Sequence, residues 1–252
     1  MCGKFTALAS WSEVVAFNGG GEGPSGGDDG SNDEIVTYRV GGLLPVIVWD
    51  AGTRVRRVVK MRWGFPDPRD WRRPRPIHAR SETIDGKEPF RTPFHAGQRG
   101  IVIFRTFNEG EEVVKPSGRT ETRQWTIDPR DGQPRGFAFV WRRFEISDLP
   151  APMLACVMAT VPANELIRRT IKSQEDDPRM PAILEDEAWS TWLGEGDATP
   201  ATAKAVLRTH GRRELADSAG TEEAETTQAL TKGRLGGFRF WKTSGSFAVQ
   251  ST

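Results

Sequence analysis

Short runs of β-branched and aromatic residues, separated by turn signals, recur along this chain and constrain its fold more than any other feature. Such residues favour strands because their side chains pack well on a half-buried pleated surface. The run 54–63 alternates basic and apolar residues, which is typical of a strand with one face in solvent. Strands are predicted at 35–40, 43–49, 54–63, 99–107, 125–127, 137–141 and 153–160.

Helical spacing is rarer. It predicts short helices over 5–17, 164–171 and 186–193. The stretch 66–76 is dense in proline and arginine and is predicted to be a loop. At 252 residues, the chain is long enough for one sizeable domain or two small ones. Many short strands with few helices indicate an α+β fold with an open or barrel-like sheet.

Two segments have too little apolar content to pack. Residues 18–33 are rich in Gly, Asp and Ser and are predicted to form a flexible loop. Residues 196–252 are predicted to form a polar C-terminal extension, partly disordered or with a short terminal strand at 237–241. The domain itself is expected to span residues 2–195.

The composition indicates a cytoplasmic protein. No apolar run reaches the length of a membrane span, and no basic segment followed by an apolar stretch marks a secretory signal. The two cysteines, Cys2 and Cys156, are too few for a disulfide framework. Cys156 lies in an apolar run, which indicates a buried structural thiol. The three histidines have no ligand-like spacing with these cysteines, so we expect neither a metal nor a cofactor.

Positive charge is concentrated in one segment, although the formal net charge of the chain is only +1. Residues 54–80 contain ten basic and two acidic residues, an excess of eight positive charges, with Trp63 and Trp71 among the arginines. A one-sided basic block with interleaved tryptophans indicates a surface that faces phosphates. We therefore expect a nucleic-acid partner.

The first two residues, Met1 and Cys2, offer a specific chemistry. Methionine aminopeptidases act when the second residue is small, and their action here would leave an amine and a thiol on Cys2. An α-amine titrates near ~8 and a thiol near ~8.5, so both are partly nucleophilic at neutral pH. Such an aminothiol condenses with an aldehyde to an imine, which the sulfur closes to a five-membered thiazolidine.

Four short motifs occur in a fixed order and together carry a family resemblance. They are Met1-Cys2-Gly3-Lys4-Phe5, Met61-Arg62-Trp63-Gly64-Phe65-Pro66, His78-Ala79-Arg80-Ser81-Glu82-Thr83 and Arg179-Met180-Pro181. In this order the chain resembles the SOS-response-associated peptidase (SRAP) family over roughly residues 2–193. The resemblance implies a single domain with a mainly antiparallel, barrel-like sheet and a few flanking helices.

The resemblance also implies a function. Family members become covalently linked through the N-terminal cysteine to abasic sites in single-stranded DNA, as a thiazolidine formed with the ring-opened sugar. This implies that Cys2 is the nucleophile and that a monomer acts on single-stranded DNA containing abasic sites, in association with the nucleoid. The family motifs further imply DNA contacts for a set of basic and aromatic residues: Lys4, Arg62, Trp63, Arg80 and Arg179. A core position for Trp63, beside Gly64, is the alternative.

The remaining catalytic positions depart in part from the family pattern. The family glutamate falls on Glu109, or on Glu111 if the register shifts by two residues. His78 stands where the family has an asparagine, and Asp177 stands where it has a histidine. Both replacements can hydrogen-bond, and Asp177 can carry a proton. A solvent-facing glutamate, a packing histidine and a turn aspartate are the structural alternatives.

Three functions remain open on the sequence alone. The first is an abasic-site sensor that forms a covalent crosslink through Cys2. The second is an autopeptidase with Cys2 as its N-terminal nucleophile, although such an enzyme has no need of the basic segment 54–80. The third is a degenerate member of the family that binds DNA without crosslinking.

Overall fold

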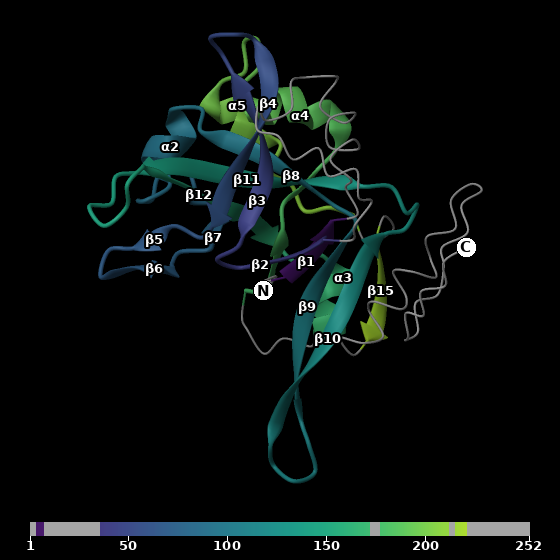
Figure 1. Cartoon of the computed structure of the whole chain (residues 1–252). Helices are drawn as coiled ribbons and strands as arrows, with labels where there is room; N and C mark the ends of the chain where they lie inside the picture. Colours follow the sequence, from purple (N-terminus) through teal and green to yellow (C-terminus); the bar gives the residue numbers. More distant parts are fainter. Residues whose placement is uncertain (1–3, 8–35, 172–176, 212–214, 221–252) are drawn as a thin grey trace, which may run out of the picture.

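The structure, a computed structural model, describes residues 4–7, 36–171, 177–211 and 215–220 (Figure 1). Its strands are β1 (Lys4–Ala7), β2 (Val36–Arg39), β3 (Leu43–Asp50), β4 (Val55–Trp63), β5 (Pro66–Asp67), β6 (Asp70–Pro74), β7 (His78–Arg80), β8 (Arg99–Phe104), β9 (Thr106–Val114), β10 (Thr120–Pro129), β11 (Arg135–Phe144), β12 (Met153–Pro162), β13 (Arg179–Pro181), β14 (Ile183–Leu184) and β15 (Leu215–Gly220). Its helices are α2 (Arg91–His95), α3 (Glu165–Ile171), α4 (Trp189–Leu193), α5 (Pro200–Ala205) and the 3-10 turn η1 (Asp186–Ala188).

The larger of the two main sheets is partly ring-like. Its strands follow the order β13-β12-β4-β3-β8-β11-β14, and β11 also pairs with β12, so that five strands return on themselves. The pairing is antiparallel except where β12 runs parallel to β4 and to β7. The prediction of an α+β fold with a mainly antiparallel sheet is therefore confirmed.

The second sheet, in the order β15-β10-β9-β1-β2, takes the N-terminal strand into its interior. β1 pairs with β2 on one side and with β9 on the other. Phe5 is consequently fully buried and contacts Trp63 and Phe137 of the ring-like sheet, with ring centroids 5.2 and 5.5 Å apart. This aromatic contact joins the two sheets into one core, as expected for a single domain.

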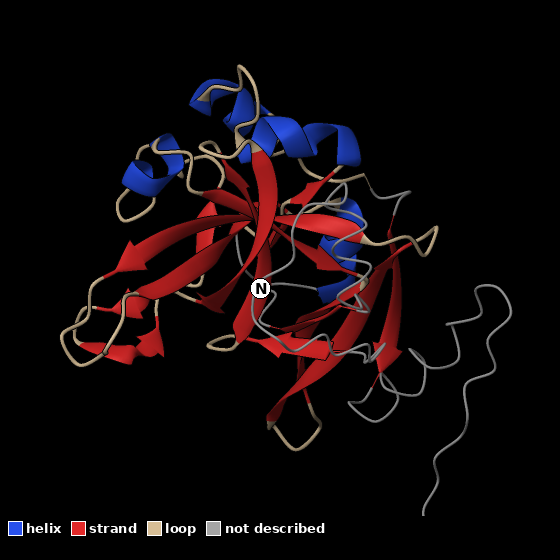
Figure 2. Cartoon of the chain, turned by 45° about the horizontal axis from the view of Figure 1, so that its top comes forward, coloured by secondary structure: helices blue, strands red, loops and turns tan. Residues whose placement is uncertain are grey.

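The helices cover the ends of the sheets. Figure 2 shows α2, α4 and α5 gathered over one end of the strands, while α3 lies beside the second sheet. The chain beyond residue 195 packs on the same body, because Lys204 of α5 reaches Asp85 (2.6 Å) and β15 extends the second sheet alongside β10. Within the described residues, no helix is both long and apolar enough to span a membrane.

Three predictions about local structure are wrong. The helix predicted over 5–17 begins instead with strand β1, and its residues 8–17 lie outside the described part of the chain. The predicted loop 66–76 contains a short hairpin, β5–β6. The single strand predicted over 99–107 is two strands, β8 and β9, and β9 continues through the acidic run to Val114. Cys2, the loop 18–33 and the terminal strand predicted at 237–241 lie outside the described residues.

Candidate functional site

The N-terminal strand sets the position from which the first residues of the chain start. Lys4 lies opposite Arg39 of β2 and Asn108 of β9. Phe5 anchors this register, because it lies opposite Phe107 in the ladder and its ring is fully buried in the core. Cys2 itself is outside the described residues, two positions before Lys4.

Glu109 follows Asn108 and is fully buried. Strand alternation explains this, because residues 107, 109 and 111 point to one face of β9 and Phe107 of that set lies in the core. Glu111 is also buried, but its carboxylate accepts a hydrogen bond from Trp125 Nε1 (2.9 Å) and lies 3.6 Å from a guanidinium nitrogen of Arg123. Glu109, unlike Glu111, is adjacent in sequence to Asn108, the residue of β9 that pairs with Lys4. The solvent-facing alternative therefore does not describe Glu109.

The Arg62-Trp63-Gly64 motif supports the fold, and Trp63 takes the core position that is the alternative to a DNA contact. Its indole is fully buried against Phe5 and Phe139, which leaves no ring face for a base. Gly64 has φ +103°, and a Cβ there would lie 2.4 Å from Pro74 Cβ, so only glycine lets the chain turn back under β6.

Arg62 binds the protein's own backbone. One terminal nitrogen donates to Trp71 O (2.6 Å) and the other to Arg72 O. Burial lowers the pKa of the guanidinium from its usual value, although the field of Asp70 opposes the shift. Arg62 therefore fixes the hairpin β5–β6, and its donors are already used there.

The hairpin β5–β6 together with Arg75, here called the basic hairpin, carries most of the exposed basic residues of the segment 54–80. Arg72 and Arg73 have side-chain exposures of 70% and 77%, and the Arg72 guanidinium lies 4.7 Å from the Trp71 ring centroid. Its other exposed arginines are Arg69 and Arg75.

Acidic side chains compensate part of the basic segment, both within the hairpin and outside it. Asp70 lies 3.4 Å from the Arg73 guanidinium and 4.0 Å from that of Arg72. Arg56 pairs with Glu195 (2.5 Å), and Arg57 pairs with Asp50 (3.0 Å). The segment 54–80 is therefore not uniformly available to a ligand, and four of its seven exposed basic residues lie on the basic hairpin.

The His78–Thr83 motif lies along β12. His78 pairs with Met158 and Arg80 with Thr160 in a parallel ladder, and Ser81 N continues it by donating to Thr160 O (2.8 Å). Alternation buries Ala79 and turns His78 and Arg80 to the opposite face of β7, where His78 is half-buried and Arg80 is exposed.

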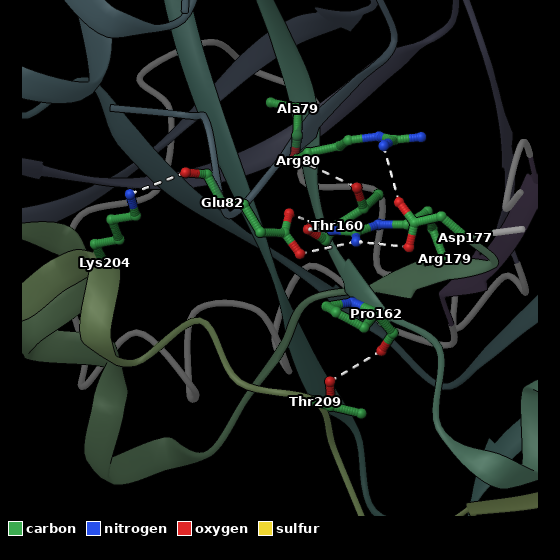
Figure 3. Close-up of polar contacts among 9 residues, drawn as sticks. All are labelled: Ala79, Arg80, Glu82, Thr160, Pro162, Asp177, Arg179, Lys204 and Thr209. Carbon is green, nitrogen blue, oxygen red and sulfur yellow. Dashed lines mark hydrogen bonds and ion pairs between the residues drawn. The ribbon is translucent and has the colours of Figure 1, made fainter. Parts of the chain in front are cut away.

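Four charged side chains from two motifs form a continuous chain beside this strand (Figure 3). Arg179 donates to both carboxylate oxygens of Glu82, at 2.8 and 2.6 Å, and its guanidinium lies 3.4 Å from Asp177 Oδ1. The other oxygen of Asp177 accepts from Arg80 at 2.8 Å. The structure therefore brings together Arg80, Asp177 and Arg179, which the sequence predicts as site residues, with Glu82, which it does not.

Arg179 is not on the surface. Its side chain is 3% exposed, and it also donates to Thr160 O at 3.0 Å. Partial burial raises the pKa of Glu82, but the hydrogen bonds and charge of Arg179 outweigh it and hold the pKa below its usual range. A direct DNA contact does not fit a buried guanidinium whose terminal nitrogens are held by Glu82 and Thr160 O. Glu82 stands within the recognised motif, and that position was the only sequence signal for its role.

The structure also locates the second thiol and the acidic groups. Cys156 is fully buried and its Sγ lies 3.6 Å from Arg62 O. Burial raises the pKa of this thiol, which fits the structural role predicted for it. Over the described ranges, histidine, cysteine and acidic side chains do not cluster in threes as a metal site would need.

Solved structures with similar folds come from two bacteria. A protein from Bacteroides thetaiotaomicron aligns with a TM-score of 0.72 at 19% identity, covering 89% of this chain and 94% of that chain. A protein from Bordetella bronchiseptica aligns with a TM-score of 0.68 at 19% identity, covering 87% of this chain and 100% of that chain. A phage-related protein from the same organism aligns with a TM-score of 0.60 at 16% identity, covering 88% of this chain and 95% of that chain. At these identities the likeness defines the fold class.

The sequence comparison defines the family. Residues 1–219 match the SOS response associated peptidase (SRAP) family, and the chain belongs to it. Membership associates the protein with the response to DNA damage and with a peptidase-like role. No curated protein matches the sequence.

Proposed function

We propose that this protein is an abasic-site sensor that links itself covalently to single-stranded DNA through Cys2, after Met1 has been removed. The observation that carries the proposal is the register of β1, in which Lys4 lies opposite Asn108, the neighbour of buried Glu109. Two residues of chain span at most about 7 Å, so Cys2 starts within reach of this part of β9.

The chemistry follows from the two nucleophiles on one residue. The Cys2 amine adds to the C1 aldehyde of the ring-opened sugar, and loss of water gives an imine. The thiolate then adds to the imine carbon, and the nitrogen takes up a proton as the five-membered thiazolidine closes. No oxidant or cofactor is consumed.

Glu109 and His78 are proposed to move protons during these steps. Addition of the amine requires proton transfer from nitrogen to oxygen, and loss of water requires an acid at that oxygen. Glu109 is a buried carboxyl group close to the start of the chain, and His78 is half-buried on the face of β7 that carries Arg80. Both residue types exchange protons readily near neutral pH when their surroundings favour it.

The DNA strand is proposed to run over Arg80, Lys4 and the basic hairpin. Arg80 is 58% exposed, and the hairpin presents further arginines around Trp71. Guanidinium groups suit this role because they bind phosphate oxygens in bidentate geometry. Arg62 supports this surface from below through the backbone of the hairpin.

The test uses an oligonucleotide in which a uracil glycosylase has converted one uracil to an abasic site. The parent protein is expected to give an SDS-stable complex, whereas Cys2→Ala gives none and Glu109→Gln forms it more slowly. The intact mass of the purified protein must show that Met1 is absent. A Cys2→Ala variant that crosslinks as well as the parent would disprove the thiazolidine.

A peptidase role is the second candidate, because the family is described as one of peptidases. It predicts that Met1 is lost from purified protein in the absence of aminopeptidase, and that Cys2→Ala retains Met1 under the same conditions. DNA binding by the parent without any crosslink would instead identify a degenerate, non-covalent member.

A further inference from the structure

Asp177 bridges two arginines that differ in their freedom to move. Its Oδ1 lies 3.4 Å from Arg179 Nη1, and its Oδ2 accepts a hydrogen bond from Arg80 Nη1 at 2.8 Å. Each carboxylate oxygen therefore faces a different guanidinium, and Figure 3 shows the carboxylate between them.

One of these arginines is fixed. Arg179 is 3% exposed and is held by Glu82 through two hydrogen bonds and by Thr160 O through a third. The same carbonyl accepts from Ser81 N, so Arg179 is tied to the ladder between β7 and β12. It gives Asp177 a rigid positive neighbour.

The other arginine is accessible. The Arg80 side chain is 58% exposed, and its contact with Asp177 engages one nitrogen of a planar group that carries five N–H donors. An exposed arginine loses rotamer freedom when it binds a phosphate, and a carboxylate that already orients it reduces that cost.

We propose that Asp177 is a positioning residue: held by the buried Arg179, which Glu82 fixes in turn, it orients the Arg80 guanidinium toward a phosphate of the bound strand. This inference takes its ligand, single-stranded DNA, from the proposed function. It assigns Asp177 a role other than proton transfer, because both of its oxygens face arginines, which do not exchange protons in the physiological range.

The test is a double-mutant cycle on non-covalent binding of the full chain to an undamaged fluorescent oligonucleotide. Asp177→Asn is expected to weaken binding about threefold when Arg80 is present, as for a partly exposed ion pair. In an Arg80→Gln background the same substitution should change binding by less than about 1.5-fold. Asp131→Asn is the matched control, since the Asp131 carboxylate is about as exposed as that of Asp177 and pairs with Arg135 (2.6 Å), and it should leave affinity unchanged in both backgrounds.

Two results would overturn the inference. Equal weakening in both backgrounds would mean that Asp177 does not act through Arg80. Tighter binding by Asp177→Asn would mean that its carboxylate competes with the phosphate. Unfolding midpoints within about 2 °C of the parent would exclude misfolding as the cause.

Crosslinking gives an independent readout. At saturating abasic DNA, Asp177→Asn should leave the pH profile of the rate parallel to that of the parent, whereas loss of one limb would identify a proton carrier and reject the positioning role. If the parent binds DNA but never crosslinks, the proposed function fails while the binding cycle still decides the role of Asp177.

Discussion

Arg99 donates hydrogen bonds to Phe94 O (2.8 Å) and Trp192 O (2.5 Å), and so joins the last turns of α2 and α4. Its side chain is buried, and Gly194, just after α4, lies so close that a Cβ there would be 2.8 Å from an Arg99 nitrogen. Carbonyl groups at helix ends lack partners within the helix, so a buried cation can satisfy several at once.

Arg99→Met should therefore destabilise the fold by about 2–3 kcal/mol, because the helix-end carbonyls lose charged donors in a buried setting. Chemical denaturation measures this loss. Arg75→Met, at an exposed arginine, is the control and should change stability by less than about 0.5 kcal/mol. Equal stability of the two variants would refute the structural role of Arg99.

Substitutions of Trp63 distinguish a role in the core from a role in stacking on a base. Trp63→Ala should cost about 3–5 kcal/mol of stability, as expected when a large buried aromatic side chain is removed. Trp63→Phe keeps much of the packing and should bind single-stranded DNA within about twofold of the parent, because stacking on a base is worth about 1–3 kcal/mol and none is expected here. A tenfold loss of affinity in a stably folded Trp63→Phe variant would restore the stacking role.

The basic hairpin should contribute to DNA binding through charge. Arg72→Gln and Arg73→Gln should each weaken binding and reduce the slope of log K against log salt by about 0.7, the value for one phosphate contact on a single strand. Arg57→Gln is the control, because Arg57 pairs with Asp50 as Arg72 and Arg73 pair with Asp70, but lies on β4, outside the hairpin. If all three substitutions changed the slope alike, the attraction would come from net charge and not from the hairpin.

The Glu82–Arg179 pair should make stability depend on pH. The pKa of Glu82 is lowered in the folded state, so its contribution is present above the unfolded value near ~4.3 and is lost as the pH falls through the folded value. The difference in urea midpoint between the parent and Glu82→Gln should thus be largest near neutral pH and shrink in acid. A midpoint difference that grew in acid would show that the ionised Glu82 does not stabilise the fold through Arg179.

Cys156 should be chemically inert in the folded protein. Its pKa is raised by burial, so the reactive thiolate is scarce at pH 8. Iodoacetamide should label Cys156 only after denaturation, which peptide mass spectrometry detects. Rapid labelling of Cys156 in the folded chain would show that β12 opens more easily than its packing indicates.

The strands of the ring-like sheet could be predicted because their patterns are local. β3, β4 and β12 coincide with the predicted runs within a residue or two, since branched side chains and flanking turns mark them. The prediction at Phe5 is wrong. Its spacing from later apolar residues fits a helix, but pairing with β2 and β9 determines that it lies in a strand. Tertiary pairing of this kind leaves no local signal.

The candidate site was predictable where motif and chemistry coincide. Arg80 and Asp177 were singled out, but their contact joins residues 97 positions apart, and no spacing rule predicts it. Glu109 lies in a run of acids, which suggests solvent exposure, and only the alternation of β9 beneath Phe107 explains its burial. The proline-dense stretch 66–76 forms a hairpin because Gly64 and Arg62 hold it from below.

The place of β1 between β2 and β9 has a mechanical consequence. A DNA strand attached at the N-terminus would pull β1 along its length, and the load would pass as shear into hydrogen-bond ladders on both sides at once. Ladders loaded in parallel must rupture together, which resists force far better than peeling one bond at a time. A polymerase or helicase that met such an adduct would therefore pull against the whole sheet.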